Sequence, residues 1–140
     1  MRARYLLDTN VVSELRRSRP HPAVAGWLES VAGAELVLSV LTIGEIHLGV
    51  ERLRRRDPRQ AETVAHWLHQ LRQGYADRIL PVTSAIVTRW AELNVDRPLP
   101  AVDSLIAATA IEHDAVLVTR NVADLEGAAV PMIDPFAFAG

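Results

Sequence analysis

Short apolar runs alternate along this chain with longer segments in which apolar residues recur every three or four positions. The short runs are typical of buried strands and predict strands at residues 3–7, 35–38, 78–82, 115–119 and 130–133. The longer segments predict helices at residues 11–17, 23–32, 43–56, 58–74, 84–94 and 102–113. This alternation favours an α/β fold, in which a short and mainly parallel sheet carries helices on both faces.

Acidic side chains stand where these predicted elements meet. Asp8 directly follows the first strand, and Asp124 follows the strand at 115–119. We place Glu45 and Asp103 in the first turns of their helices, which start at the same end of the sheet. Carboxylates crowded at one edge repel one another unless a hard cation neutralises them, so the pattern predicts a site for Mg²⁺ or Mn²⁺.

Each of these residues also has a simpler structural interpretation. Glu45 could close a capping box with Thr42 at the start of its helix. Asp103 could serve only to complement the helix dipole. Asn121 could be a helix N-cap that places Asp124 at the third helical position. Asp8 is the hardest to explain in this way, because a carboxylate at the end of a buried strand needs a partner or a metal.

Composition removes several alternatives. The 140 residues show no repeat and no linker, so we expect one domain spanning residues 1–140. Cys and Lys are absent, which excludes disulfides, zinc thiolate sites, cysteine nucleophiles and lysine-dependent phosphate chemistry. The apolar runs are too short to span a membrane, and the first is broken at Asp8, too early for a signal peptide. We therefore expect a cytoplasmic protein with no membrane partner.

Four motifs in a fixed order carry a family resemblance. They read LLDTN at residues 6–10, SVLTIGEI at 39–46, DSLIAATA at 103–110 and VTRNVADL at 118–125, and a tail IDPF follows at 133–136. In these motifs the chain resembles the PIN-domain ribonucleases, and specifically the VapC-type toxins of bacterial toxin–antitoxin pairs.

The resemblance implies a single PIN-like domain that hydrolyses RNA phosphodiester bonds at a carboxylate site for Mg²⁺. It implies that Asp8, Glu45 and Asp103 form that site, with Asp8 and Asp103 as metal ligands. The fourth acid stands at the position of Asn121 in some members of the family and at that of Asp124 in others. Because an amide oxygen is the weaker ligand, we assign Asp124 as the fourth catalytic acid. Asn10 and Asn121 are then supporting residues.

Partners follow from the same resemblance. It implies an RNA substrate, a VapB-type antitoxin and a homodimer, with apolar helix surface around Trp27 or Trp67 as the interface. Arg16 and Arg120 lie nearest the predicted site and are our candidates for RNA contact, because guanidinium groups bind phosphate bidentately. The arginines between residues 52 and 59 are better explained as a solvated helix end.

Two other functions compete with this one. A catalytically idle PIN-like module could act only as the partner of a DNA-binding antitoxin, although its acids would then have no reason to be present. A phosphotransferase of the haloacid-dehalogenase kind is disfavoured, because Asn10 stands where a second Asp is needed and the chain has no Lys.

Overall fold

A computed structural model describes residues 3–140 of the chain. Its centre is a parallel sheet of five strands in the order β3-β2-β1-β4-β5. The strands are β1 (Arg4–Leu7), β2 (Glu35–Ser39), β3 (Ile79–Leu80), β4 (Val116–Val118) and β5 (Met132–Ile133). The expected α/β fold with a mainly parallel sheet is confirmed.

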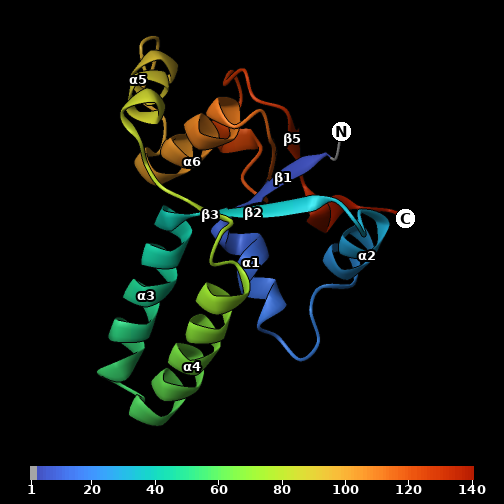
Figure 1. Ribbon diagram of the computed structural model, residues 1–140, viewed down its shortest axis with the longest axis vertical. Helices are drawn as coiled ribbons and strands as arrows, with labels where there is room; N and C mark the ends of the chain where they lie inside the picture. The colour runs from blue at the N-terminus through green and yellow to red at the C-terminus, as the bar shows by residue number, and fades with distance from the viewer. Residues whose placement is uncertain (1–2) are drawn as a thin grey trace.

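Helices cover both faces of this sheet (Figure 1). One face carries α1 (Thr9–Leu15), α2 (Pro22–Ser30), α3 (Val40–Arg54) and α4 (Pro58–Gly74), and the other carries α5 (Ser84–Leu93) and α6 (Ala101–Glu112). Two short 3₁₀ helices, η1 (Ala123–Leu125) and η2 (Pro135–Ala137), follow β4 and β5. Helices α3 and α4 form a long hairpin that extends away from the sheet.

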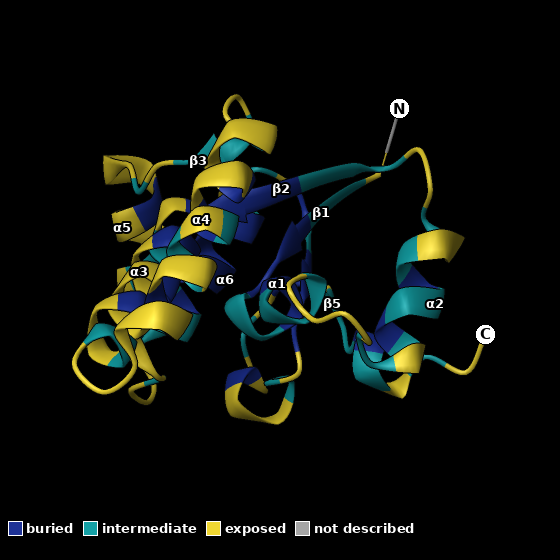
Figure 2. Ribbon diagram, turned by 90° about the horizontal axis from the view of Figure 1, so that it is seen from below, coloured by how far each residue is buried: buried dark blue, intermediate teal, exposed yellow. Residues whose placement is uncertain are grey.

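Alternation along the strands divides the core into two layers. Leu7, Leu38 and Val118 pack on the side of α1 to α4. Their chain neighbours Leu6, Val37 and Leu117 pack on the side of α6. Successive side chains of a strand point to opposite faces, so strands that are apolar at every position are buried on both sides (Figure 2).

Helix α6 lies deepest in the molecule. Ser104 and the five residues from Ile106 to Ala110 are fully buried, as suits a helix whose sequence is nearly continuously apolar. No helix among residues 3–140 combines the length and the apolar character that crossing a membrane requires.

Several predicted boundaries differ from the structure by one to three residues, and two of these differences have a clear physical reason. Helix α3 begins at Val40 instead of residue 43, because the Ser39 hydroxyl accepts the Leu41 N–H and caps the helix directly after β2. Strand β3 ends at Leu80 instead of residue 82. Pro81 has no N–H to give to a neighbouring strand, so the ladder stops before it.

Candidate functional site: a carboxylate cluster at the switch point of the sheet

The sheet changes its winding direction beside β1, its central strand. The chain passes from β1 to β2 and β3 on one side and later returns to β4 and β5 on the other. The ends of β1 and β4 lie next to each other, and the Asp8 N–H donates to the Val118 carbonyl at 2.9 Å. In open parallel sheets, ligands bind in the crevice outside the carboxyl ends of the strands at such a point.

Asp8 stands in this crevice and is only 2% exposed. It is the N-cap of α1, where its Oδ1 accepts the Thr9 N–H at 2.8 Å. Its Oδ2 accepts the Thr119 hydroxyl at 2.7 Å. These two donors hold the carboxylate in one orientation, and no arginine or histidine side chain of residues 3–140 pairs with it.

Thr119 is a site residue that the sequence analysis did not single out. It is fully buried, and its hydroxyl also accepts the Asn121 N–H at 3.0 Å. Asn10 holds the same loop from α1, because its Oδ1 accepts the Arg120 N–H at 3.2 Å. A buried threonine at the end of a strand is a weak signal in sequence, and only its contact with Asp8 shows its importance.

Glu45 reaches the cluster from α3, where the structure corrects its expected position and rules out its alternative interpretation. It lies in the second turn of the helix instead of the first, and it closes no capping box with Thr42, because the cap is Ser39. Its exposed carboxylate accepts the Thr9 hydroxyl, which also lies 3.3 Å from the Thr42 hydroxyl. Thr9, a second residue missed in the sequence, therefore connects Glu45 to the end of β1.

Asp103 lies in the first turn of α6, as expected. The N-cap residue of this helix is Pro100, whose side chain has no hydrogen-bond acceptor. Burial is the main cause that raises the pKa of this carboxyl group above its ordinary value. The negative charges of Asp8, Glu45 and Asp124 raise its pKa further, while the Asn121 side chain acts against them. The structure thus brings all four predicted acids into one electrostatic cluster.

The arrangement after β4 rules out the interpretation of Asn121 as a helix N-cap. It is no N-cap, since η1 begins only at Ala123, its cap position is Val122, and no side chain caps it. Instead, the Thr119 hydroxyl accepts the Asn121 N–H and so fixes the turn of the loop. The side-chain amide of Asn121 is thereby free to lie beside Asp103. Asp124 is exposed on η1, at the rim of the cluster.

The donor set of the cluster consists of oxygen atoms, as a hard cation requires. No basic side chain is among the groups that shift the pKa of Asp103, so nothing cationic compensates the negative charge there. Within residues 3–140, no three such side chains already converge closely enough to enclose one ion. By chemistry and charge the residues fit Mg²⁺ or Mn²⁺.

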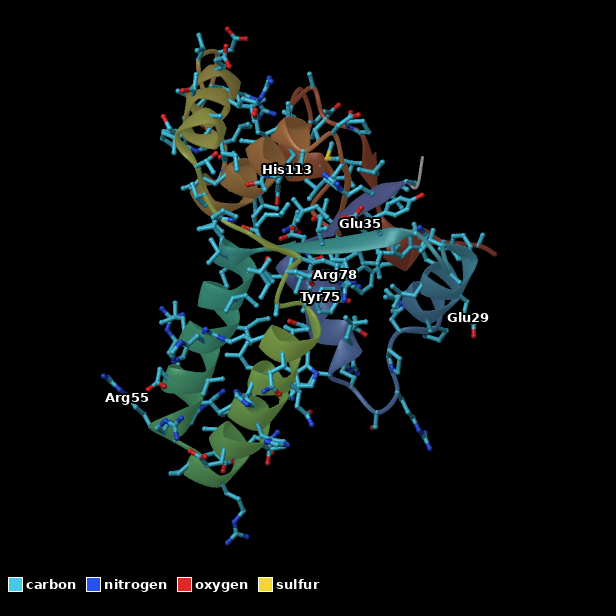
Figure 3. All side chains as sticks on the ribbon, viewed as in Figure 1. Glu29, Glu35, Arg55, Tyr75, Arg78 and His113 are labelled. Atoms are coloured by element: carbon cyan, nitrogen blue, oxygen red, sulfur yellow. The ribbon has the colours of Figure 1, made fainter. Side chains whose placement is uncertain are left out.

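The two arginines predicted to contact RNA lie on different sides of the cluster. Arg16 follows α1 and lines a groove of about 250 Å³ that also includes Thr9 and Glu45. Arg120 directly follows Thr119, and its guanidinium carbon lies 4.0 Å from the centre of the Phe136 ring. The arginine-rich end of α3 is exposed, and Arg55 points away from the rest of the molecule (Figure 3).

The tryptophans named as dimer surface differ in accessibility. Trp27 is only 3% exposed and packs edge-on against Tyr5, with ring centres 5.2 Å apart. It belongs to the core and offers no interface, because it fills the space between α2 and the sheet. Trp67 is half-buried and lines the groove that contains Arg16.

Comparison with known proteins identifies the fold. The sequence pattern of the PIN domain matches residues 5–126. This chain belongs to the PIN-domain family. The domain is 32% identical over 140 residues to a protein named Toxin FitB from Neisseria gonorrhoeae, covering 94% of this chain and 97% of that protein. It is 30% identical to VapC ribonuclease Y4jK from Sinorhizobium fredii, covering 94% and 96%.

Solved structures agree with this assignment. The PIN domain matches the crystal structure of FitAcB from Neisseria gonorrhoeae with a TM-score of 0.85 and 31% identity, covering 96% of this chain and 99% of that chain. Other solved structures with this fold are described as a toxin–antitoxin complex and as a member of the VapBC family of toxin–antitoxin systems.

Asp124 and Asn121 can be separated by experiment. We expect Asp124→Asn to lower RNA cleavage about tenfold and to raise the Mg²⁺ concentration that cleavage needs. Both effects should be smaller than those of a change at Asp103, because Asp124 lies at the exposed rim. Asn121→Ala should leave the melting temperature nearly unchanged, since Asn121 caps no helix. A titration of cleavage rate against Mg²⁺ tests both variants. If the metal dependence were altered in Asn121→Ala and unaltered in Asp124→Asn, the assignment of Asp124 as the fourth acid would be reversed.

Proposed function

We propose that this PIN domain is a metal-dependent endoribonuclease that acts as the toxin of a toxin–antitoxin pair. The observation that supports it is the carboxylate cluster at the switch point, in which the pKa of Asp103 is raised by burial and by three other acids. Clustering of uncompensated carboxylates disfavours folding, so it is best explained by a ligand of positive charge. The names of the relatives point in the same direction.

Asp8 and Asp103 would hold the metal ion, with Glu45 and Asp124 completing the negative charge around it. When bound, Mg²⁺ or Mn²⁺ activates water and stabilises the charge that develops on the phosphate. Asp8 is oriented for this task by the Thr9 N–H and the Thr119 hydroxyl. Glu45 is exposed, and among residues 3–140 its carboxylate accepts only the Thr9 hydroxyl, which leaves it free to accept a proton from the attacking water.

Removal of divalent cations is the direct test of this function. The purified protein should cleave single-stranded RNA in the presence of Mg²⁺ or Mn²⁺, and EDTA should abolish the cleavage. Added Mg²⁺ should restore it, whereas Ca²⁺, which is larger and less strict in geometry, should restore little. Cleavage that persists in EDTA would contradict a metal site. Absence of cleavage under every condition would favour the idle PIN-like module instead.

The partners are part of the same proposal. A cytoplasmic nuclease must be kept from the RNA of its own cell, and we propose a VapB-type antitoxin that occludes the carboxylate cluster. We also propose a homodimer, for which the half-buried Trp67 remains a candidate contact and Trp27 does not. Size-exclusion chromatography with light scattering tests the dimer, and a monomer at micromolar concentration would contradict it.

A further inference from the structure

A second hollow lies beside the carboxylate cluster and has no role in the metal chemistry. It has a volume of about 540 Å³ and begins at Arg120, next to the loop that supports Asp8. Val122 and Met132 give it an apolar floor, and Glu126 and Asp134 stand at its rim. The combination of an apolar floor with a few polar groups is typical of a site for a small, flat ligand.

Arg120 is fixed in orientation at this hollow. Its backbone N–H is held by Asn10, and its guanidinium lies over the Phe136 ring at 4.0 Å. His21 packs edge-on against the same ring, with ring centres 5.3 Å apart, so a second contact holds the ring in place. The guanidinium group is exposed and forms no ion pair among residues 3–140. One face of it therefore remains available for stacking.

The charges at the rim select the kind of ligand. Two carboxylates and one guanidinium line the hollow, and the Arg97 guanidinium donates to the Glu126 carbonyl beside it. The lining therefore offers a ligand carboxylate acceptors as well as a cation. Asp134 Oδ1 accepts the Phe136 N–H at 2.9 Å, while the Glu126 side chain is exposed and has no hydrogen-bond partner among the described residues. Free carboxylate oxygens accept hydrogen bonds from amino groups, as they do from the N4 amino group of cytosine.

We propose that this hollow, formed by Arg120, Val122, Glu126, Met132 and Asp134, binds one unpaired base of the RNA substrate, and that it favours bases with an exocyclic amino group over uracil. The proposal rests on the proposed function. The base stacks on the free face of Arg120, as single-stranded bases do on guanidinium planes, and its amino group donates to Glu126. The hollow thus contributes to sequence preference beside the site of cleavage.

Binding of short RNAs in EDTA tests the hollow without requiring cleavage. We expect fluorescence anisotropy to show that labelled oligocytidylate and oligoadenylate bind about fivefold to tenfold more tightly than oligouridylate. Glu126→Gln should reduce this preference to about twofold, because a neutral acceptor forms the weaker hydrogen bond. Arg120→Lys keeps the charge but loses the plane, and it should weaken binding of all three RNAs about tenfold.

Exposed residues away from the hollow provide matched controls. Glu29→Gln on α2 and Arg19→Lys before α2 should bind all three RNAs as the wild type does. Equal affinity of the wild type for the three RNAs, no RNA binding at all, or an unchanged preference in Glu126→Gln would each overturn the proposal. So would an Arg120→Lys variant that behaves like Arg19→Lys.

Cleavage with Mg²⁺ separates this proposal from the proposed function. A protein that cleaves RNA but binds the three oligonucleotides equally would refute the base site and leave the nuclease standing. A protein that binds with the expected preference and cleaves nothing would support the base site and refute the nuclease.

Discussion

Replacing Asp103 by Asn is expected to lower RNA cleavage by at least about 100-fold. The variant keeps the size of the side chain in the first turn of α6 and removes one of the two charges that we propose to bind the metal directly. Loss of a residue that merely supports a metal ligand costs about 10- to 100-fold, so loss of a ligand itself should exceed that range. Single-turnover cleavage at saturating Mg²⁺ measures the effect.

The same variant should be more stable than the wild type when metal is absent. Burial and the three neighbouring acids raise the pKa of Asp103 in the folded protein above the ordinary value of 3.8. Its ionised form therefore opposes folding, and this cost grows as the pH rises from that ordinary value through the raised pKa. Asn has no charge to lose, so Asp103→Asn should melt at a higher temperature in EDTA at neutral pH and show no advantage in acid.

Asp96→Asn is the matched control for both measurements. Asp96 is exposed in the connection between α5 and α6, and its side chain forms no ion pair or hydrogen bond with any of residues 3–140. It should change neither cleavage nor melting temperature. An Asp103→Asn variant that cleaves at the wild-type rate would remove Asp103 from the metal site. One that is inactive and less stable at neutral pH would show that its loss of activity reflects misfolding.

Thr119→Val is expected to raise the Mg²⁺ concentration for half-maximal cleavage about 10- to 100-fold. The substitution keeps the shape of the buried side chain but removes the donor to Asp8 Oδ2 and the acceptor of the Asn121 N–H. Asp8 then loses one of the two contacts that orient it. Loss of the partner of the buried Asp8 Oδ2 should also cost about 1–3 kcal/mol of stability, measured by urea unfolding.

A second buried threonine distinguishes the role in metal binding from simple loss of stability. Thr109 is equally buried, but its hydroxyl donates at 2.8 Å to the Leu105 carbonyl within α6 and forms no hydrogen bond with an acidic side chain of residues 3–140. Thr109→Val should leave the Mg²⁺ requirement unchanged, and Thr119→Ser, which keeps the hydroxyl, should restore it. Equal Mg²⁺ requirements in Thr119→Val and Thr109→Val would contradict a role of Thr119 in positioning Asp8.

The sequence by itself determined the architecture and the location of the acids. Apolar residues that fill every position of a strand can be buried only between two layers, so the runs ending at Leu7 and Val118 predicted a sheet covered on both faces. Parallel strands connected through helices place their carboxyl ends at one edge. For that reason Asp8 and Asp103 could be placed together although 95 residues, 103 − 8, separate them in the sequence.

The tertiary structure alone decided which side chains hold the acids in place. Asp8 is oriented by Thr119, 111 residues away, and Glu45 by Thr9, 36 residues away. Local pattern also allowed a capping box for Glu45 and an N-cap for Asn121, because cap motifs are short and depend only on neighbouring residues. Both were wrong, since Ser39 already caps α3 and the Thr119 hydroxyl already turns the loop after β4. A polar side chain binds whichever partner the packed core brings within reach, and that choice depends on the spacing of β1 and β4 in the folded sheet.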